Sequence, residues 1–369
     1  MRILQVSSAK SFGGGERHLA DLINGLTRRG HEVFLAAPKD SPLQGEKGKI
    51  VLPPENILPV NVRSALDISA TRQLAALIRT HGIEIVHAHL ARDYFPVSLA
   101  ARMARSAGGA KFVLTRHVLF PMKTLHRFAL ANVSRAIAVS GAVADQMTEE
   151  RIFPPEKIVT IPNGIDVSHW RDAPHEDLRA EFRSLHGIPR DVPLVGAVGE
   201  LKKLKGQEDL LLAAEMILQS FPETYFVIAG ADNSGSGYLK HLKDLAAAIG
   251  AEDRFIWIER VDDTGPLLHA ADVFVSASHS ESFGLAILEA MASGCAIVST
   301  DTEGAKELLG EKGLIPIGDP LKLANAVNLF LSDKEKRDEN GRINQEIAQK
   351  NFALEKMIEA TERLYQDLF

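Results

Sequence analysis

Short apolar runs alternate with amphipathic segments along most of this chain. The apolar runs, such as "RILQVSS" and "IEIVHAHL", are rich in β-branched residues, as is typical of buried strands. The segments between them, such as "GERHLADLINGLTRRG" and "ATRQLAALIRTHG", carry apolar residues at helical spacing. Strands that alternate with helices in this way form parallel sheets. The pattern therefore predicts an α/β protein.

The alternation is interrupted once, near the middle of the chain. "KIVTIPNGIDVSHW" closes the first series of strands, and a stretch with Pro174, Pro189 and Pro193 follows. The alternation restarts with "LVGAVGE", "TYFVIAGA", "RFIWIER", "DVFVSAS" and "AIVST". We therefore predict two doubly wound, Rossmann-like domains that face a central cleft. Residues 1–170 form the first and 171–351 the second, and a helix over about 352–369 packs back on the first.

Composition agrees with a folded protein of two domains. The chain has 369 residues, of which 45% are apolar and 24% charged, which argues against disorder. We find neither a signal peptide nor an apolar run long enough to cross a membrane, so a cytoplasmic location is expected. The single cysteine, Cys295, excludes a disulfide within the chain and is interpreted as a buried structural thiol.

The charge is distributed unevenly between the two halves. Residues 1–168 contain 21 Lys and Arg against 14 Asp and Glu, whereas residues 169–369 contain 21 against 34. A basic half on an acidic protein is typical of a domain that meets an anionic surface, such as phospholipid or an anionic glycan. Ordinary solvated charge is an equally good interpretation. No nucleic acid partner is expected.

Ligands of doubly wound sheets bind at the carboxyl ends of the strands, so the following turns are the places to search for chemistry. In "SFGGGERH", Gly13, Gly14 and Gly15 precede a helix and allow backbone N–H groups to approach an anion or a sugar. His18 stands where a dinucleotide-binding motif would have its third glycine, which disfavours a dehydrogenase. A tight turn without a ligand is the alternative.

Histidines follow two other predicted strands. His117 in "LTRHVLF" could donate a hydrogen bond to a sugar hydroxyl or stand near a reacting centre, although a surface role is the commoner one. His87 and His89 fall on one face of a strand, but no third metal ligand is evident nearby in the sequence. We interpret these two as structural or substrate-side groups.

A lysine cluster follows the first strand of the second domain. In "GELKKLKGQEDLLLAA", Lys202, Lys203 and Lys205 crowd a strand-to-helix loop. Lysines at such a position can neutralise a diphosphate. A solvated run of charge is the alternative.

The stretch "HSESFGLAILEAMASGCAIVST" places Glu281 before a predicted helix and Glu289 within it. About a turn and a half of helix separates the two carboxylates by roughly 10 Å, so they cannot share a proton. The helix N-terminus, with the N–H groups of Phe283, Gly284 and Leu285, offers an anion site between them. An anion flanked by two groups that accept hydrogen bonds from hydroxyls describes a nucleoside diphosphate sugar.

These motifs together resemble the retaining nucleotide-sugar glycosyltransferases of family 4, which have the GT-B fold. "ESFGLAILE" is similar to their pair of glutamates separated by seven residues, "SFGGGERH" to their glycine loop and "LTRH" to a strand end. "IAVSGAVADQM", "IPNGID", "VGELKKLKGQEDLLLAA" and "FVIAGA" resemble further segments in the same order. The resemblance covers nearly the whole chain.

In the second domain, the resemblance implies that Glu289 binds the nucleotide ribose and Glu281 a hydroxyl of the donor sugar. It also implies that Lys205 holds the diphosphate, together with the amides of Phe283, Gly284 and Leu285. Lys202 is assigned to the donor as well, and Glu307 in "DTEGAKELLG" resembles a glutamate that follows a glycine loop.

In the first domain, the resemblance implies that Gly14 and Gly15 approach the donor phosphates and that His117 contacts the transferred sugar. The catalytic assignments are therefore His117, Lys205 and Glu281.

The sequence departs from the family at Glu200, where an arginine is usual. A carboxylate beside a diphosphate is repulsive, so Lys202 or Lys203 could reach the site instead, the register could be shifted, or the rate could be reduced. This departure makes a nucleotide-sugar-binding protein without turnover one alternative. A same-fold sugar-nucleotide epimerase is the other.

The resemblance implies a hexosyltransferase that retains configuration, with the leaving phosphate oxygen accepting the proton of the acceptor. The chain has no Asp-x-Asp motif, so metal independence is expected, with no cofactor beyond the nucleotide sugar, which is a substrate. UDP is favoured because it is frequent in the family. The base, sugar, linkage and oligomeric state stay open.

The expected acceptor is a glycan or lipid-linked glycan of the cell envelope or an exopolysaccharide. "PMKTLHRFALANVSR" predicts a basic and apolar helix, either lying on an anionic membrane or, as we favour, packed on its own sheet. Peripheral contact with the inner face of the plasma membrane through the N-terminal domain is therefore considered.

Overall fold

The computed structural model describes residues 1–44, 50–104, 109–124, 126–172, 175–233, 235, 237–259 and 263–369. The chain forms two compact units, one of Met1–Gly164 with Leu354–Phe369 and the other of Ile165–Ala353. The first division falls a few residues before the predicted boundary at 170. Helix α6 (Val167–Arg171) belongs to the second unit because it contacts helices α11 and α14 there.

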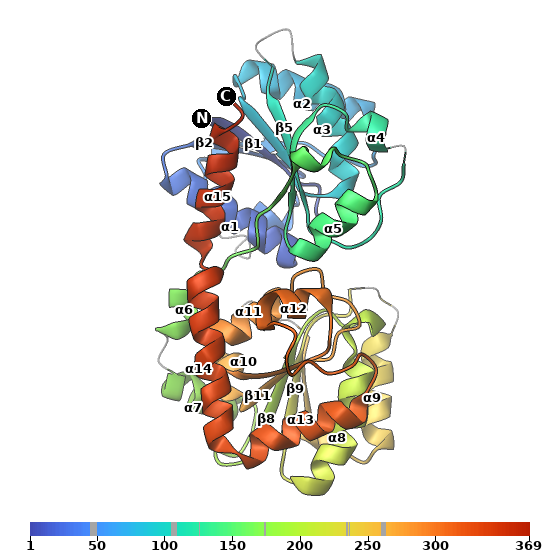
Figure 1. Ribbon diagram of the computed structural model, residues 1–369, viewed down its shortest axis with the longest axis vertical. Coiled ribbons are helices and arrows are strands. Elements are labelled where there is room, and N and C mark those ends of the chain that lie inside the picture. Colours follow the sequence, from blue (N-terminus) through green and yellow to red (C-terminus); the bar gives the residue numbers. More distant parts are fainter. Residues whose placement is uncertain are drawn as a thin grey trace. The chain divides into compact units, whose positions relative to one another are not determined.

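The first unit is built on one sheet of parallel strands (Figure 1). The strand order is β3-β2-β1-β4-β5-β6-β7. Its strands are β1 (Arg2–Val6), β2 (Glu32–Ala37), β3 (Ile57–Pro59), β4 (Ile85–Ala88), β5 (Lys111–Arg116), β6 (Val133–Ala138) and β7 (Ile158–Thr160). Its helices are α1 (Gly14–Arg28), α2 (Ile68–Thr80), α3 (Ala91–Met103), α4 (His126–Ala129), α5 (Gly141–Glu149) and α15 (Leu354–Gln366). The predicted strands of this half are all present.

The C-terminal helix α15 completes the core of the first unit. It packs on α1 so closely that a Cβ added at Gly25 would lie 2.1 Å from Cδ1 of Ile358. The hydroxyl of Tyr365 lies 2.6 Å from Nδ1 of the buried His87, on the central strand β4. The end of the chain therefore fixes side chains in the middle of the sheet.

The second unit has a smaller parallel sheet in the order β10-β9-β8-β11-β12. Its strands are β8 (Leu194–Val198), β9 (Tyr225–Ala229), β10 (Phe255–Ile258), β11 (Val273–Ser276) and β12 (Ala296–Ser299). Besides α6, its helices are α7 (His175–Leu185), α8 (Gln207–Ser220), α9 (Tyr238–Ala248), α10 (Gly265–Ala270), α11 (Leu285–Ala292), α12 (Glu303–Leu309), α13 (Pro320–Ser332) and α14 (Lys334–Asn351). Cys295 is buried in this unit, and burial raises the pKa of its thiol to about 12. The thiol is thus held in its inert, neutral form.

The predicted helix in "PMKTLHRFALANVSR" is wrong for most of its length. The described helix there is α4, four residues long, and Val133 already begins strand β6; Leu125 lies outside the described residues. The reason is that the alternating residues of "VSRAIA" pair with β5, which takes this segment into the sheet. Among the described helices, none is long and apolar enough to cross a membrane.

Candidate functional site

The strand order of the second unit places the ends of β8 and β11 next to each other at the edge of the sheet. Strand β9 lies on one side of β8 and β11 on the other, so the order reverses between them. The loops that leave the carboxyl ends of these neighbouring strands diverge to opposite faces and leave a crevice, where ligands of doubly wound sheets bind. The lysine cluster follows β8, and Glu281 follows β11.

Lys205 and Glu281 meet at this reversal point. Nζ of Lys205 lies 2.5 Å from Oε1 of Glu281, and the hydroxyl of Ser278 donates to the same oxygen at 3.0 Å. The two charged side chains are 23% and 16% exposed, so each still reaches solvent. A cation and an acceptor oxygen are therefore held side by side at the end of the sheet.

Helix α11 begins at Leu285, four residues after Glu281. Gly284 is its N-cap with φ +95°, a left-handed conformation that favours glycine. Among the described residues, no hydrogen-bond partner is found for the N–H groups of Phe283, Gly284 and Leu285. The buried ring of Phe283 packs edge-on against Phe352 and anchors the loop. These amides and the helix dipole favour an anion at this end of α11.

Glu289 lies farther along α11 and is buried, with 5% of its surface exposed. Its Oε2 accepts a hydrogen bond of 2.8 Å from the hydroxyl of Thr264, at the start of α10. Glu281 and Glu289 thus have different partners, as expected for carboxylates that do not share a proton.

Two glycines allow the loops of this site to run against each other. A Cβ at Gly206, which has φ +64°, would lie 1.8 Å from the carbonyl oxygen of Ala277, just past the end of β11. A Cβ at Gly304 would lie 2.6 Å from the carbonyl of Phe283, and the N–H of Gly304 donates to the carbonyl of Glu281 at 2.9 Å. These close approaches fix the backbones on either side of the Lys205–Glu281 pair.

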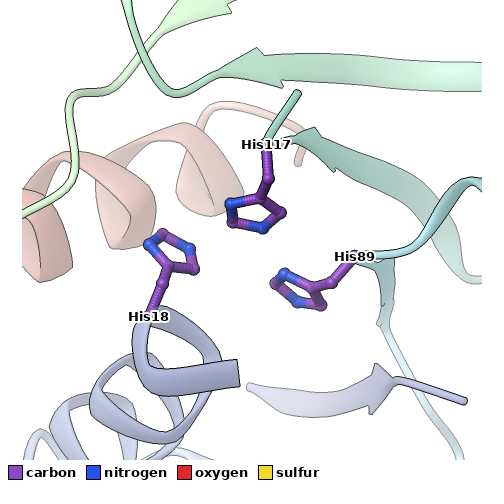
Figure 2. A group of neighbouring side chains, drawn as sticks. All are labelled: His18, His89 and His117. Atoms are coloured by element: carbon purple, nitrogen blue, oxygen red, sulfur yellow. The ribbon is translucent and has the colours of Figure 1, made fainter. Parts of the chain in front are cut away.

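The first unit has its own reversal point, between β1 and β4. The glycine loop follows β1, and a Cβ at Gly15 would lie 3.9 Å from the ring of His117, which stands just after β5. His117 also faces His18 of α1 and His89 after β4 (Figure 2). Burial lowers the pKa of all three imidazoles, that of His18 to about 4, so they are neutral at pH 7.

Two family models match the chain, one for each half. The model "Glycosyltransferase Family 4" matches residues 12–169, and "Glycosyl transferases group 1" matches 179–346. Together they cover most of the sequence. The chain belongs to the family 4 glycosyltransferases.

The relatives of this glycosyltransferase are named after different compounds. D-inositol 3-phosphate glycosyltransferase of Corynebacterium urealyticum is 26% identical, with 90% of this chain and 86% of the relative covered. N-acetyl-alpha-D-glucosaminyl L-malate synthase of Bacillus anthracis is also 26% identical, over 82% and 79% of the two chains. Anabaena Alr3699/HepE, solved in complex with UDP and glucose, has a TM-score of 0.85 at 22% identity, with 100% of both chains covered. The fold, predicted as GT-B, is thereby confirmed.

Glu200, where the family usually has an arginine, forms an ion pair with a lysine of the same loop. Oε2 of Glu200 lies 2.5 Å from Nζ of Lys202, and both side chains are partly exposed. The lysine offsets the carboxylate, so Lys202 is engaged with Glu200, while Lys203 is exposed. Of the three lysines, Lys205 is the one that contacts Glu281.

The other predicted residues of the glycosyltransferase are placed as follows. Gly14 begins α1, and Gly15 follows it in the first turn. Glu307 is partly buried on α12, the helix that carries Gly304. The roles of all these residues towards a donor stay predictions.

Sequence reasoning missed several contributors. Thr264 and Ser278, the partners of the two glutamates, belong to no motif, and they are identified only when the chain is folded. The sequence around His89 shows no further metal ligand besides His87, because the two histidines that lie near His89, His18 and His117, come from distant elements.

Proposed function

We propose that this glycosyltransferase moves a hexose from a nucleoside diphosphate sugar, with UDP as the nucleotide, to a hydroxyl of its acceptor with retention of configuration. The observation that supports this most directly is the contact between Lys205 and Glu281 beside the amides at the start of α11. A diphosphate needs cations and N–H donors, and a sugar needs an acceptor for its hydroxyls.

In this proposal the donor replaces the ion pair. The ammonium of Lys205 turns to the diphosphate, and Glu281 accepts a hydrogen bond from a sugar hydroxyl. Glu289 accepts hydrogen bonds from the ribose hydroxyls, with Thr264 holding its carboxylate in place. Lys205 and Glu281 therefore each exchange a protein partner for a polar group of the ligand.

The reaction breaks the bond between the anomeric carbon and the diphosphate oxygen. Negative charge grows on the leaving oxygen, where Lys205 and the amides of Phe283, Gly284 and Leu285 stabilise it. The acceptor oxygen bonds to the anomeric carbon on the same face, and its proton passes to a phosphate oxygen of the leaving group. We propose that no metal ion is needed at the diphosphate, because lysine and helix N-terminus supply the positive charge.

For the acceptor we propose a glycan or lipid-linked glycan of the cell envelope. Phe120 and Phe128 of the first unit are 67% and 75% exposed, and Lys123 and Arg127 are near them in sequence. Apolar and basic side chains together suit peripheral contact with an anionic lipid surface.

The test begins with nucleotide binding by the second unit. Both tryptophans, Trp170 and Trp257, belong to this unit, so their fluorescence reports its unfolding. We expect UDP and one UDP-sugar to raise its melting temperature in the presence of a chelator, and GDP and ADP to have little effect, because a ligand of the folded state stabilises it. If none of these nucleotides stabilises the unit, the proposed donor site is wrong.

Replacing Glu289 by glutamine should weaken this binding about tenfold or more, because hydrogen bonds from hydroxyls to a charged acceptor are lost. Glutamine keeps the size of the buried side chain and can still accept from Thr264, so the fold should be preserved. The exposed Glu303 on α12 provides a matched control, and Glu303→Gln should bind as the natural protein does. Equal weakening in both variants would contradict the assignment of Glu289.

The reaction products distinguish a transferase from a binding protein without turnover and from an epimerase. A transferase releases nucleoside diphosphate from the bound donor, and the product formed with an acceptor has the same anomeric configuration as the donor, which NMR can read. Binding without release would indicate a nucleotide-sugar-binding protein, the alternative raised by Glu200. Interconversion of free nucleotide sugars without an acceptor would indicate an epimerase.

A further inference from the structure

Three histidine side chains of the first unit converge from three separate elements (Figure 2). His18 comes from helix α1, His89 from the end of β4 and His117 from the end of β5. Each offers one ring nitrogen, and these three nitrogens lie within 4.8 Å of one another. The elements are fixed by the sheet and by α1, so the convergence is built into the fold of this unit.

The nitrogens of this cluster lack partners within the described part of the chain. Nδ1 of His89 and Nε2 of His117 are buried without a hydrogen bond. The ring nitrogens of His18 have no hydrogen bond of ordinary geometry either, although the side chain of Asn163 lies close enough to act on the pKa of this ring. His18 and His89 are each only 4% exposed. An unpaired buried polar atom costs about 1–3 kcal/mol, so several of them in one place indicate that a ligand belongs there.

A second layer of hydrogen bonds orients His89 towards the cluster. Nε2 of His89 donates to Oε1 of Gln5 at 2.8 Å, and Nε2 of Gln5 donates to the hydroxyl of Tyr365 at 3.3 Å. The proton of the neutral ring is therefore on Nε2, which leaves the lone pair of Nδ1 available to a ligand. A histidine that donates its second N–H in this way is the usual form of a metal ligand.

We propose that His18, His89 and His117 bind a divalent first-row transition metal ion, for which Zn²⁺ is the natural probe. Imidazole nitrogen suits Zn²⁺, Co²⁺, Ni²⁺ and Cu²⁺, whereas Mg²⁺ and Ca²⁺ require oxygen ligands. Three histidines leave one position of a tetrahedral ion open to water or to an oxygen of a substrate. His117 is also the residue predicted to contact the transferred sugar, but binding of the ion can be tested without the donor.

The rings need a small adjustment to hold the ion. Zinc–nitrogen bonds of about 2.0–2.1 Å place tetrahedral ligand atoms roughly 3.4 Å apart, whereas the three nitrogens lie within 4.8 Å, so they must approach by up to about 1.4 Å. His117 supplies this movement because it stands on a loop and is the least buried of the three.

The test is a titration of the full chain, without a histidine tag and stripped with a chelator, by Zn²⁺ in a calorimeter and by Co²⁺ in a spectrophotometer. We expect one ion per chain and the visible absorption of tetrahedral Co²⁺. His117→Ala and His89→Ala should each weaken binding about 10- to 100-fold or more. Circular dichroism checks that each variant is folded, because UDP binding by the second unit does not report on the first.

His175→Ala is the matched control, because exposed His175 contacts another histidine, His269, in the second unit. It should bind Zn²⁺ as the natural protein does. The proposal is overturned if the natural protein takes up no ion, or if folded His117→Ala and His89→Ala bind Zn²⁺ as tightly as the control. The nitrogens would then bind water or a substrate hydroxyl instead.

Discussion

We expect Lys205→Met to release nucleoside diphosphate from the donor about 10²- to 10³-fold more slowly than the natural protein, mainly through kcat. The ammonium lies 2.5 Å from Glu281, at the place where we position the diphosphate. Without it, the charge that grows on the leaving oxygen loses its cation, and Glu281 is left as an uncompensated carboxylate beside the phosphates. The measurement is the steady-state release of nucleoside diphosphate, with kcat and KM determined separately.

Lys203→Met is the control for this variant, because Lys203 belongs to the same loop but is exposed. Its kcat should stay close to that of the natural protein. If both variants kept the natural rate, leaving-group stabilisation by Lys205 would be refuted, even if donor binding persisted. If only Lys203→Met were slow, the functional lysine of the loop would have been misassigned.

Gly206→Ala is expected to destabilise the second unit by about 3 kcal/mol or more. A residue other than glycine pays about 1–2 kcal/mol for the left-handed conformation that Gly206 has at φ +64°. In addition, the new Cβ would lie 1.8 Å from the carbonyl oxygen of Ala277, so the loop or the end of β11 must move, which costs about 1–3 kcal/mol. Denaturant unfolding followed by tryptophan fluorescence measures the change.

Gly187→Ala separates the two contributions. Gly187 has nearly the same φ, +68°, and no atom lies within 4 Å of its added Cβ. This control in the same unit should therefore lose only about 1–2 kcal/mol. A loss at Gly206 no larger than at Gly187 would mean that the lysine loop does not press against β11. Gly206→Ala should also weaken UDP binding, since Lys205 is the preceding residue.

The periodicity of the chain was enough to predict the strands of both sheets, apart from the short edge strand β3, and the return of the C-terminal helix. Strands of parallel sheets are buried on both faces, so they stand out as continuous apolar runs whatever their order in the sheet. The prediction failed at residues 121–135, where Met122, Leu125 and Phe128 have helical spacing in the sequence but the chain continues into β6. Pairing with β5 outweighed local pattern there.

By itself, the sequence determined the family, the two-unit α/β architecture and the residue types that suit a nucleotide sugar. These follow from local periodicity and from motifs in which the relevant residues are neighbours along the chain. Only the tertiary structure decided which side chains meet: Lys205 with Glu281, Glu289 with Thr264, and the convergence of three histidines. The physical reason is strand order, because residues far apart in sequence come together only where a sheet places their strands side by side.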